Sequence, residues 1–141
     1  MLAWLLYKTV KFKSMKIIFG GRKTNVFIAD SFAKQLVGLM YRDSIDSDQG
    51  MLFIFGRDSK WGIWMAHMKF SIDIVWIGKD GTVVDLNESA KPCASIFDCK
   101  TYYPKAESRF VLELPAGNAK RMHIGIGSRI FLPNRLLRNL K

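Results

Sequence analysis

The sequence predicts a mostly β (α+β) fold, in which a single domain of antiparallel strands forms a β-sandwich or barrel with two short helices and a C-terminal helical tail. Seven or eight runs of strand length are separated by turn residues, and only two internal segments are helical in pattern. The 141 residues, 49% of them hydrophobic and 24% charged, suffice for one domain with a real core.

The first 14 residues are expected to be a dispensable extension. Their apolar run stops at Lys8 and no basic residue precedes it, so they lack the length and flanks of an export signal. The strand pattern begins at Met15, which places the β-rich domain at residues 15–132. No other stretch approaches the roughly 18 apolar residues of a membrane span, so we expect a cytoplasmic protein.

The first half of the domain reads as a hairpin, a helix and a buried strand. "MKIIF" and "TNVFIA" are β-rich runs joined by "GGRK", whose paired glycines suit a hairpin turn. In "DSFAKQLVGLMYR", Asp30 or Ser31 can cap an amphipathic helix, and "DSIDSDQG" is a loop. The wholly apolar "MLFIF" predicts a strand covered on both faces in the middle of the sheet, followed by a turn at "GRDSK".

The second half supplies the remaining strands and the tail. "WGIWM" and "SIDIVWI" precede a "GKDG" turn into "TVVDLNE", which indicates a β-hairpin. Residues 89–104 read as an irregular loop with two cysteines, and "RFVLELP" as another strand. Pro115 suits the first turn of a helix through "AGNAKRM", and "RIF" forms a last short strand. Residues 133–141 form the basic helical tail.

The excess of basic residues lies at the two ends of the chain. The 22 lysines and arginines exceed the 12 acids by ten, yet residues 24–117 hold ten basic and twelve acidic side chains. Residues 1–23 and 118–141 hold six basic side chains each and no acid. Binding of nucleic acid or an anionic surface would therefore depend on these termini. The alternative is that they are solvated residues that keep the protein in solution.

Four strings in order carry a family resemblance: "GLMYRDSI", "GMLFIF", "IWMAHMKFSIDIVWI" and "VLELPAGNAKRMHIGIGSRI". Together they resemble the domain of unknown function 192 family of archaea and bacteria, over about residues 24–131. The resemblance implies a mostly β, sandwich-like domain and no activity. Ala66 and His67 replace a lysine and an asparagine common in the family, and Ser128 replaces an aspartate.

Asp73 is the first candidate for a working group. Strand alternation puts it on the face of Ser71, Val75 and Ile77, where an unpartnered carboxylate would be costly. By its family block Arg42 is the expected partner, since a guanidinium can satisfy a carboxylate with two hydrogen bonds. A buried ion pair and a ligand-binding role both remain open.

Glu113 is a second semi-buried acid, on the face of Val111 and Arg109. With Asp73 it could form a carboxylate pair for acid-base chemistry such as glycoside hydrolysis, provided that the two groups lie within roughly 5 to 10 Å. Capping or pairing within the fold is the commoner use of such acids.

Trp61, Trp64 and Trp76 could line an apolar or sugar-stacking pocket, although core packing is their more common use. Trp64 is the best candidate for a pocket wall because alternation puts it beside the small residues Gly62 and Ala66.

A zinc site is not expected. Five residues separate Cys93 from Cys99, outside the usual zinc spacing, and His67 and His123 are distant in sequence. The two cysteines are either free thiols or, in an oxidising or hyperthermophilic setting, a disulfide.

The preferred function is a binding or accessory module for a small polar or carbohydrate ligand, with no cofactor. Its candidate residues are Arg42, Trp64, His67, Asp73 and Glu113. The alternatives are a hydrolase using the Asp73 and Glu113 pair, and nucleic-acid or anionic-surface binding through the basic termini.

Overall fold

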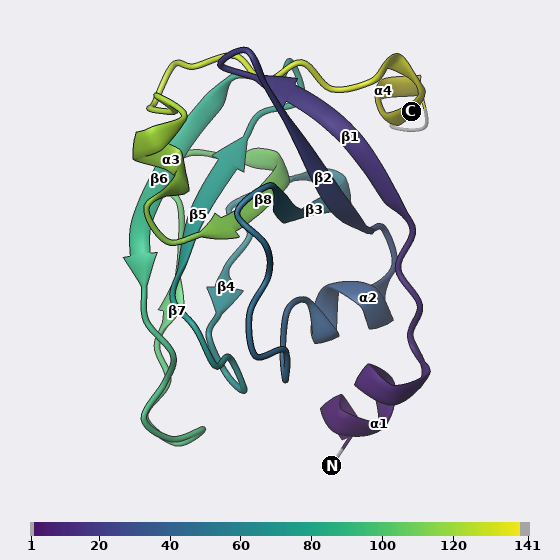
Figure 1. The fold of residues 1–141 in the computed structure, drawn as a ribbon, viewed down its shortest axis with the longest axis vertical. Helices are drawn as coiled ribbons and strands as arrows, with labels where there is room; N and C mark the ends of the chain where they lie inside the picture. Colours follow the sequence, from purple (N-terminus) through teal and green to yellow (C-terminus); the bar gives the residue numbers. More distant parts are fainter. Residues whose placement is uncertain (1, 139–141) are drawn as a thin grey trace.

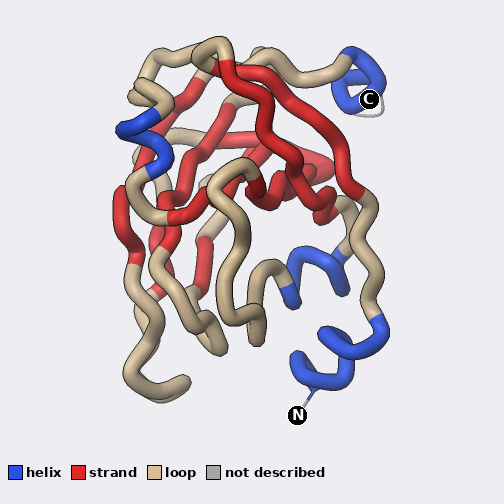
Figure 2. The backbone as a smooth tube through the Cα atoms, in the orientation of Figure 1, coloured by secondary structure: helices blue, strands red, loops and turns tan. Residues whose placement is uncertain are grey.

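In the computed structural model, which describes residues 2–138, six strands form one mixed sheet in the order β1-β2-β3-β8-β5-β6, and β4 pairs with β7 in a separate ribbon (Figure 1). The strands are β1 (Ser14–Phe19), β2 (Arg22–Ala29), β3 (Gln49–Ser59), β4 (Ile63–Trp64), β5 (Ile72–Ile77), β6 (Val83–Ala90), β7 (Thr101–Tyr102) and β8 (Ser108–Pro115). The helices are α1 (Leu2–Thr9), α2 (Phe32–Val37), α3 (Asn118–Arg121) and α4 (Asn134–Arg138). The prediction of a mostly β protein with short helices is confirmed (Figure 2).

The expectation that all strands are antiparallel is wrong for one pair. β2 and β3 pair in parallel, from Asn25 opposite Gln49 to Ala29 opposite Phe53. Residues 30–48 between these strands contain α2 and form a crossover, the long connection that parallel neighbours require.

The sheet also does not close into a barrel, because its edge strands β1 and β6 do not pair with each other. The segment that was expected to form the strand "RIF" instead makes two isolated bridges, Thr82 to Arg129 and Ile18 to Phe131. We call residues 129–132 the C-terminal clasp, because they join the start of β6 to β1.

Side chains of the sheet pack into two apolar clusters, one on each face. Val75 and Ile77 of β5 belong to one cluster together with Ala119 of α3, and we call this side the α3 face. Ile74 and Trp76 belong to the other cluster, which includes Leu39 just after α2, and we call this side the α2 face. Every residue of β5 is buried, which explains the nearly unbroken apolar run.

Both expected hairpins form. The β1–β2 turn uses Gly20 and Gly21 at φ of 55° and 72°, a conformation that favours glycine. A Cβ atom on Gly20 would lie 2.7 Å from the Met122 carbonyl oxygen, so this turn also packs closely against the residue after α3.

Three local expectations need correction. The Ser31 hydroxyl accepts from the Lys34 N–H as predicted, but α2 ends at Val37 because Gly38 adopts a φ of 49°. β3 continues to Ser59, through the residues expected to form a turn, with an irregularity after Ile54. The loop at 89–104 contains β7, which pairs with β4.

The two ends of the chain are both helical where the structure describes them. α1 was not anticipated; the ring of Tyr7 lies 5.5 Å from that of Tyr41. α4 occupies the first part of the predicted tail, and residues 139–141 of that tail lie outside the described residues. Over residues 2–138, no helix combines the length and apolar character needed to cross a membrane.

Candidate functional site

A pocket of about 290 Å³ opens on the α2 face, between α2, β3 and β4. Apolar and aromatic side chains make up most of its wall. The lining residues are Phe32, Gln35, Leu36, Val37, Gly38, Leu39, Met40, Phe53, Phe55, Trp61, Gly62, Ile63, Trp64, Met68 and Glu113.

Among the described residues that line this pocket, Glu113 is the only one with an ionisable side chain. It lies on β8 opposite Met51 of β3 and Ile74 of β5, so its flanking cross-strand neighbours are apolar. The residue is 4% exposed, and its carboxyl has no hydrogen-bond or ion-pair partner within the described residues. Burial raises the pKa of Glu113 to about 8. Such a group is a candidate for a functional site because a buried carboxyl without a partner is destabilising.

Trp64, the candidate pocket wall of the sequence analysis, contributes an exposed part of this wall. Its side chain is 41% exposed, whereas Trp76 is buried and donates its indole N–H to the Trp61 carbonyl at 2.7 Å. The Trp61 ring stacks on Phe55 at 4.1 Å and donates to the Arg57 carbonyl. Trp61 and Trp76 therefore fix the local fold. Trp61 and Trp64 both line the pocket, and Trp64 presents the more exposed ring to a ligand.

Gly62, which precedes β4 in the pocket wall, lies close to Thr101 and Tyr103 in and after β7. A Cβ atom there would lie 2.6 Å from the ring of Tyr103 and 2.7 Å from the methyl group of Thr101. The close approach of these segments therefore requires glycine at this position.

Sequence reasoning missed the contribution of α2 to the pocket. Phe32 and Leu36 fall at helical spacing within the expected amphipathic helix, yet Phe32 is 82% exposed at the start of α2 and both residues line the pocket. Helical spacing could not separate a pocket wall from a core contact, because both require an apolar side chain on the same face.

Asp73 lies away from the pocket and has a structural environment. Its fully buried carboxylate accepts two backbone hydrogen bonds of 2.9 Å, from the Ser89 N–H to Oδ1 and from the Ala119 N–H to Oδ2. The expected ion pair with Arg42 is not formed. Asp73 instead joins the end of β6 to the start of α3 on the α3 face.

Arg42 is held by aromatic rings. Its guanidinium lies 4.5 Å from the centre of the Phe27 ring and 5.7 Å from that of Phe12, in cation–π geometry. Its Nε is buried without a hydrogen-bond partner among the described residues, and burial lowers the pKa of Arg42 from its ordinary value. The neighbouring Tyr41 ring stacks on exposed His67 at 4.9 Å. Neither Arg42 nor His67 lines the pocket.

Asp73 and Glu113 do not share a face of the sheet. Asp73 is registered with Leu114 and Ile74 with Glu113 across the β5–β8 pair, and registered residues point the same way. Asp73 therefore points to the α3 face and Glu113 to the α2 face. The layer of backbone between them separates the carboxyl groups that were considered as a catalytic pair.

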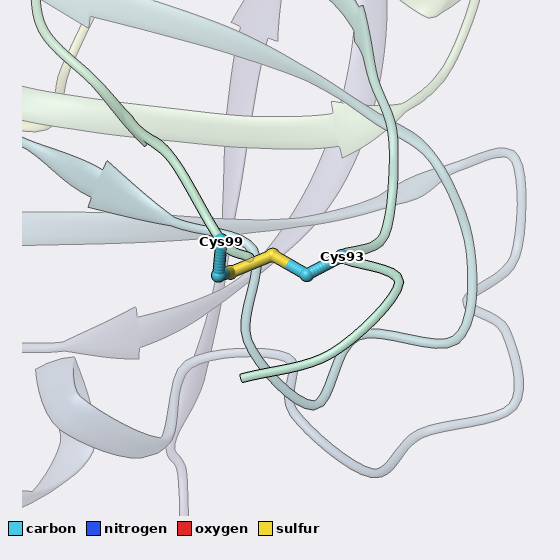
Figure 3. Close-up of a disulfide and its surroundings, with 2 residues drawn as sticks. All are labelled: Cys93 and Cys99. Carbon is cyan, nitrogen blue, oxygen red and sulfur yellow. A yellow bond between two sulfur atoms is a disulfide. The ribbon is translucent and has the colours of Figure 1, made fainter. Parts of the chain in front are cut away.

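The cysteines form a disulfide between Cys93 and Cys99, with their Cα atoms 5.1 Å apart (Figure 3). The bond closes a short loop that carries the exposed side chains of Ile96 and Phe97. Across residues 2–138, no three His, Cys, Asp or Glu side chains gather closely enough to hold a metal ion.

Comparison with known proteins identifies one family. The sequence profile of DUF192, described as "Uncharacterized ACR", matches residues 15–132. The chain is 27% identical over 107 residues to a UPF0127 protein of Pyrococcus abyssi, covering 74% of this chain and 83% of that protein. A UPF0127 protein of Thermococcus sibiricus is 30% identical over 107 residues, 74% of this chain; the match spans only 64% of that relative, less than two thirds.

Two solved structures share the fold. A candidate transcription regulator from Sinorhizobium meliloti superimposes with a TM-score of 0.77 and 29% identity, over 86% of this chain and 95% of that one. A protein of unknown function from Novosphingobium aromaticivorans gives a TM-score of 0.73 at 23% identity, over 86% and 85% of the two chains. The second likeness concerns the fold alone.

Proposed function

The chain belongs to the DUF192 family, and from that premise we propose that it is a binding module for a small, largely apolar ligand that carries one polar group. The ligand would occupy the pocket on the α2 face. Because its walls are mostly aromatic and aliphatic, this proposal replaces the polar or carbohydrate ligand expected from the sequence.

The observation that carries the proposal is the carboxyl of Glu113. A carboxyl buried without a partner is destabilising, yet the pocket places one among apolar walls. A ligand with a polar group would provide the missing hydrogen bond, and its apolar part would cover Trp64 and Phe32.

The test is a ligand-observed NMR screen of small aromatic and aliphatic molecules, with and without a polar group. Trp64→Ala should abolish the binding of hits, because it removes one pocket wall. Trp4→Ala is the matched control: it removes a similarly exposed tryptophan from α1, outside the pocket, and should leave binding unchanged. Equal binding by the wild type and Trp64→Ala would contradict the proposal.

A second candidate function is contact with an anionic membrane surface through α1. Leu2, Trp4 and Leu5 are exposed on this helix, and Lys8, Lys11 and Lys13 follow without an intervening acid. An apolar helical face beside lysines is typical of segments that lie in the interface of anionic membranes.

Vesicle sedimentation tests this second function. Binding should require anionic lipid, weaken with salt and disappear when residues 2–9 are deleted. Equal binding to zwitterionic vesicles, or binding to duplex DNA in place of vesicles, would contradict it.

A further inference from the structure

The charges around the pocket differ from those of the molecule as a whole. The protein has a formal net charge of +10, yet none of the described residues lining the pocket is lysine, arginine or histidine. An acid in a region without bases attracts cations and disfavours anions.

The cationic side chains on the surrounding elements have other partners. On α2, Lys34 pairs with Asp30 at 3.0 Å. On β8, Arg109 pairs with Asp58 of β3 at 2.8 Å. The guanidinium of Arg57 lies over the Trp61 ring at 5.0 Å. A ligand would therefore be the source of a positive charge for Glu113.

The remaining lining groups determine what kind of cation fits. A metal ion would need several oxygen, nitrogen or sulfur ligands, and Glu113 supplies the single carboxylate. The Gln35 amide already donates to the carbonyls of Ala29 and Ile54, at 3.2 and 2.9 Å. The Gln35 Nε2 group is therefore already used, and the side-chain oxygen acceptors of the lining are Gln35 Oε1 and the Glu113 carboxylate beside much apolar surface, which suits a cation whose charge is covered by alkyl groups.

Resting on the proposed function, we propose that the pocket selects small alkylated ammonium ions. The ammonium centre would lie beside the Glu113 carboxylate, and its alkyl groups would contact the rings of Trp64 and Phe32. Aromatic faces attract such cations through their negative quadrupole, and a nearby carboxylate adds a direct Coulomb attraction.

Proton linkage gives the proposal a distinct signature. Burial raises the pKa of Glu113 to about 8, so in the free protein at about pH 7 the carboxyl is mostly protonated. A quaternary ammonium ion binds the ionised form, and it must therefore displace this proton. Its affinity should rise about tenfold from about pH 7 to about pH 9 and level off above that range.

The experiment compares choline with 3,3-dimethylbutan-1-ol, which has a neutral carbon in place of the charged nitrogen, by isothermal titration calorimetry from about pH 7 to about pH 9. Choline should bind at least tenfold more tightly than the alcohol at the upper pH, and only choline should show the pH dependence. Glu113→Gln should remove both the preference and the pH dependence while it leaves the alcohol's affinity unchanged.

Glu107→Gln is the control, since it makes the same change in net charge at an exposed site and should leave choline binding as in the wild type. Equal affinities for choline and the alcohol, or a choline preference that survives in Glu113→Gln, would overturn the cation proposal and leave the apolar binding module standing. Failure of both probes to bind, with no other hit in the NMR screen, would overturn both.

Discussion

Glu113 makes the stability of the folded protein depend on pH, because its carboxyl holds a proton more tightly in the folded state than in the unfolded chain. Its pKa is raised by burial from an ordinary value of 4.5 to about 8. Below about pH 4.5 the group is protonated in both states, and above that the unfolded chain releases its proton first. The native state therefore loses stability as the pH rises from about 4.5 to about 8, with a slope of up to about 1.4 kcal/mol per pH unit.

We predict that Glu113→Gln removes this loss. The variant's free energy of unfolding, measured by urea denaturation, should exceed that of the wild type by a margin that grows from about pH 5 to about pH 8. Glu107→Gln, at an exposed position, should show no such growing margin. A constant difference between Glu113→Gln and the wild type across this range would contradict the burial of an ionisable group.

For Asp73 we predict a structural role. Asparagine at this position keeps one acceptor oxygen but turns an N–H donor toward the backbone N–H of Ser89 or Ala119. Asp73→Asn should therefore lower the free energy of unfolding by about 2 to 4 kcal/mol. Asp43→Asn, which breaks an exposed pair with Lys69, should have little effect. Unchanged stability in Asp73→Asn would exclude the structural role.

At the residue level, the sequence predicted which positions were unusual better than it predicted their partners. Alternation correctly separated the faces of Val111 and Leu112, and so indicated where Glu113 points. It could not predict the partners of Asp73, because these are backbone N–H groups 16 and 46 residues away, which have no side-chain signature. Arg42 likewise contacts Phe27 and Phe12 in place of an acid.

Among the elements, the N-terminal segment divides into two parts. α1 lies against α2 with none of its residues buried, and its Tyr7 ring lies near that of Tyr41, whereas Phe12 packs against Phe27 and the Lys13 carbonyl accepts from the Ile28 N–H at 2.8 Å. We predict that deleting residues 1–9 changes the melting temperature by a few degrees at most, and that deleting residues 1–14 lowers it distinctly more. Thermal unfolding followed by circular dichroism measures both. Equal effects would support the simpler expectation that the whole segment is dispensable.

The disulfide should stabilise its loop more than the sheet. Cys93 and Cys99 are six residues apart, and closing so short a loop stabilises a fold by about 2 kcal/mol at most in the chain-entropy description. Replacing both cysteines by serine should therefore leave the protein folded, with a free energy of unfolding lower by up to about 2 kcal/mol. Limited proteolysis should then cut the loop near Phe97 sooner than in the wild type. Global unfolding of the double variant would contradict this assignment.

Elements with strong local signals were predictable and those set by distant pairing were not. The hairpin turn at Gly20 and Gly21 follows from residues that tolerate positive φ. The parallel pairing of β2 with β3 depends on where the crossover returns, and the two-residue strands β4 and β7 are too short to show a periodicity. Neither the β2–β3 pairing nor the β4–β7 pairing has a local sequence signal.

At the scale of the whole molecule, the buried sheet was predictable because its central strands are apolar on both faces. The wholly apolar run of β3 and the buried run of β5 indicated strands covered from both sides, and the structure supplies one apolar cluster per face. The pocket was only partly predictable. Trp64 was identified from its small neighbours, but the combination of α2, β3 and β4 around Glu113 depends on the crossover that the sequence did not reveal.

The C-terminal clasp is made after all the strands, and well after the two edge strands that it bridges. Residues 129–132 bridge the ends of β1 and β6, and the Ile130 N–H donates to the Gly81 carbonyl at 2.8 Å. On the ribosome, the strands at both edges of the sheet are therefore complete long before the residues that bridge them emerge from the exit tunnel. Before β8 emerges, the edges of β3 and β5 that it joins are open too, so pairing between neighbouring chains on a polysome would be most favoured before β8 and the clasp are made.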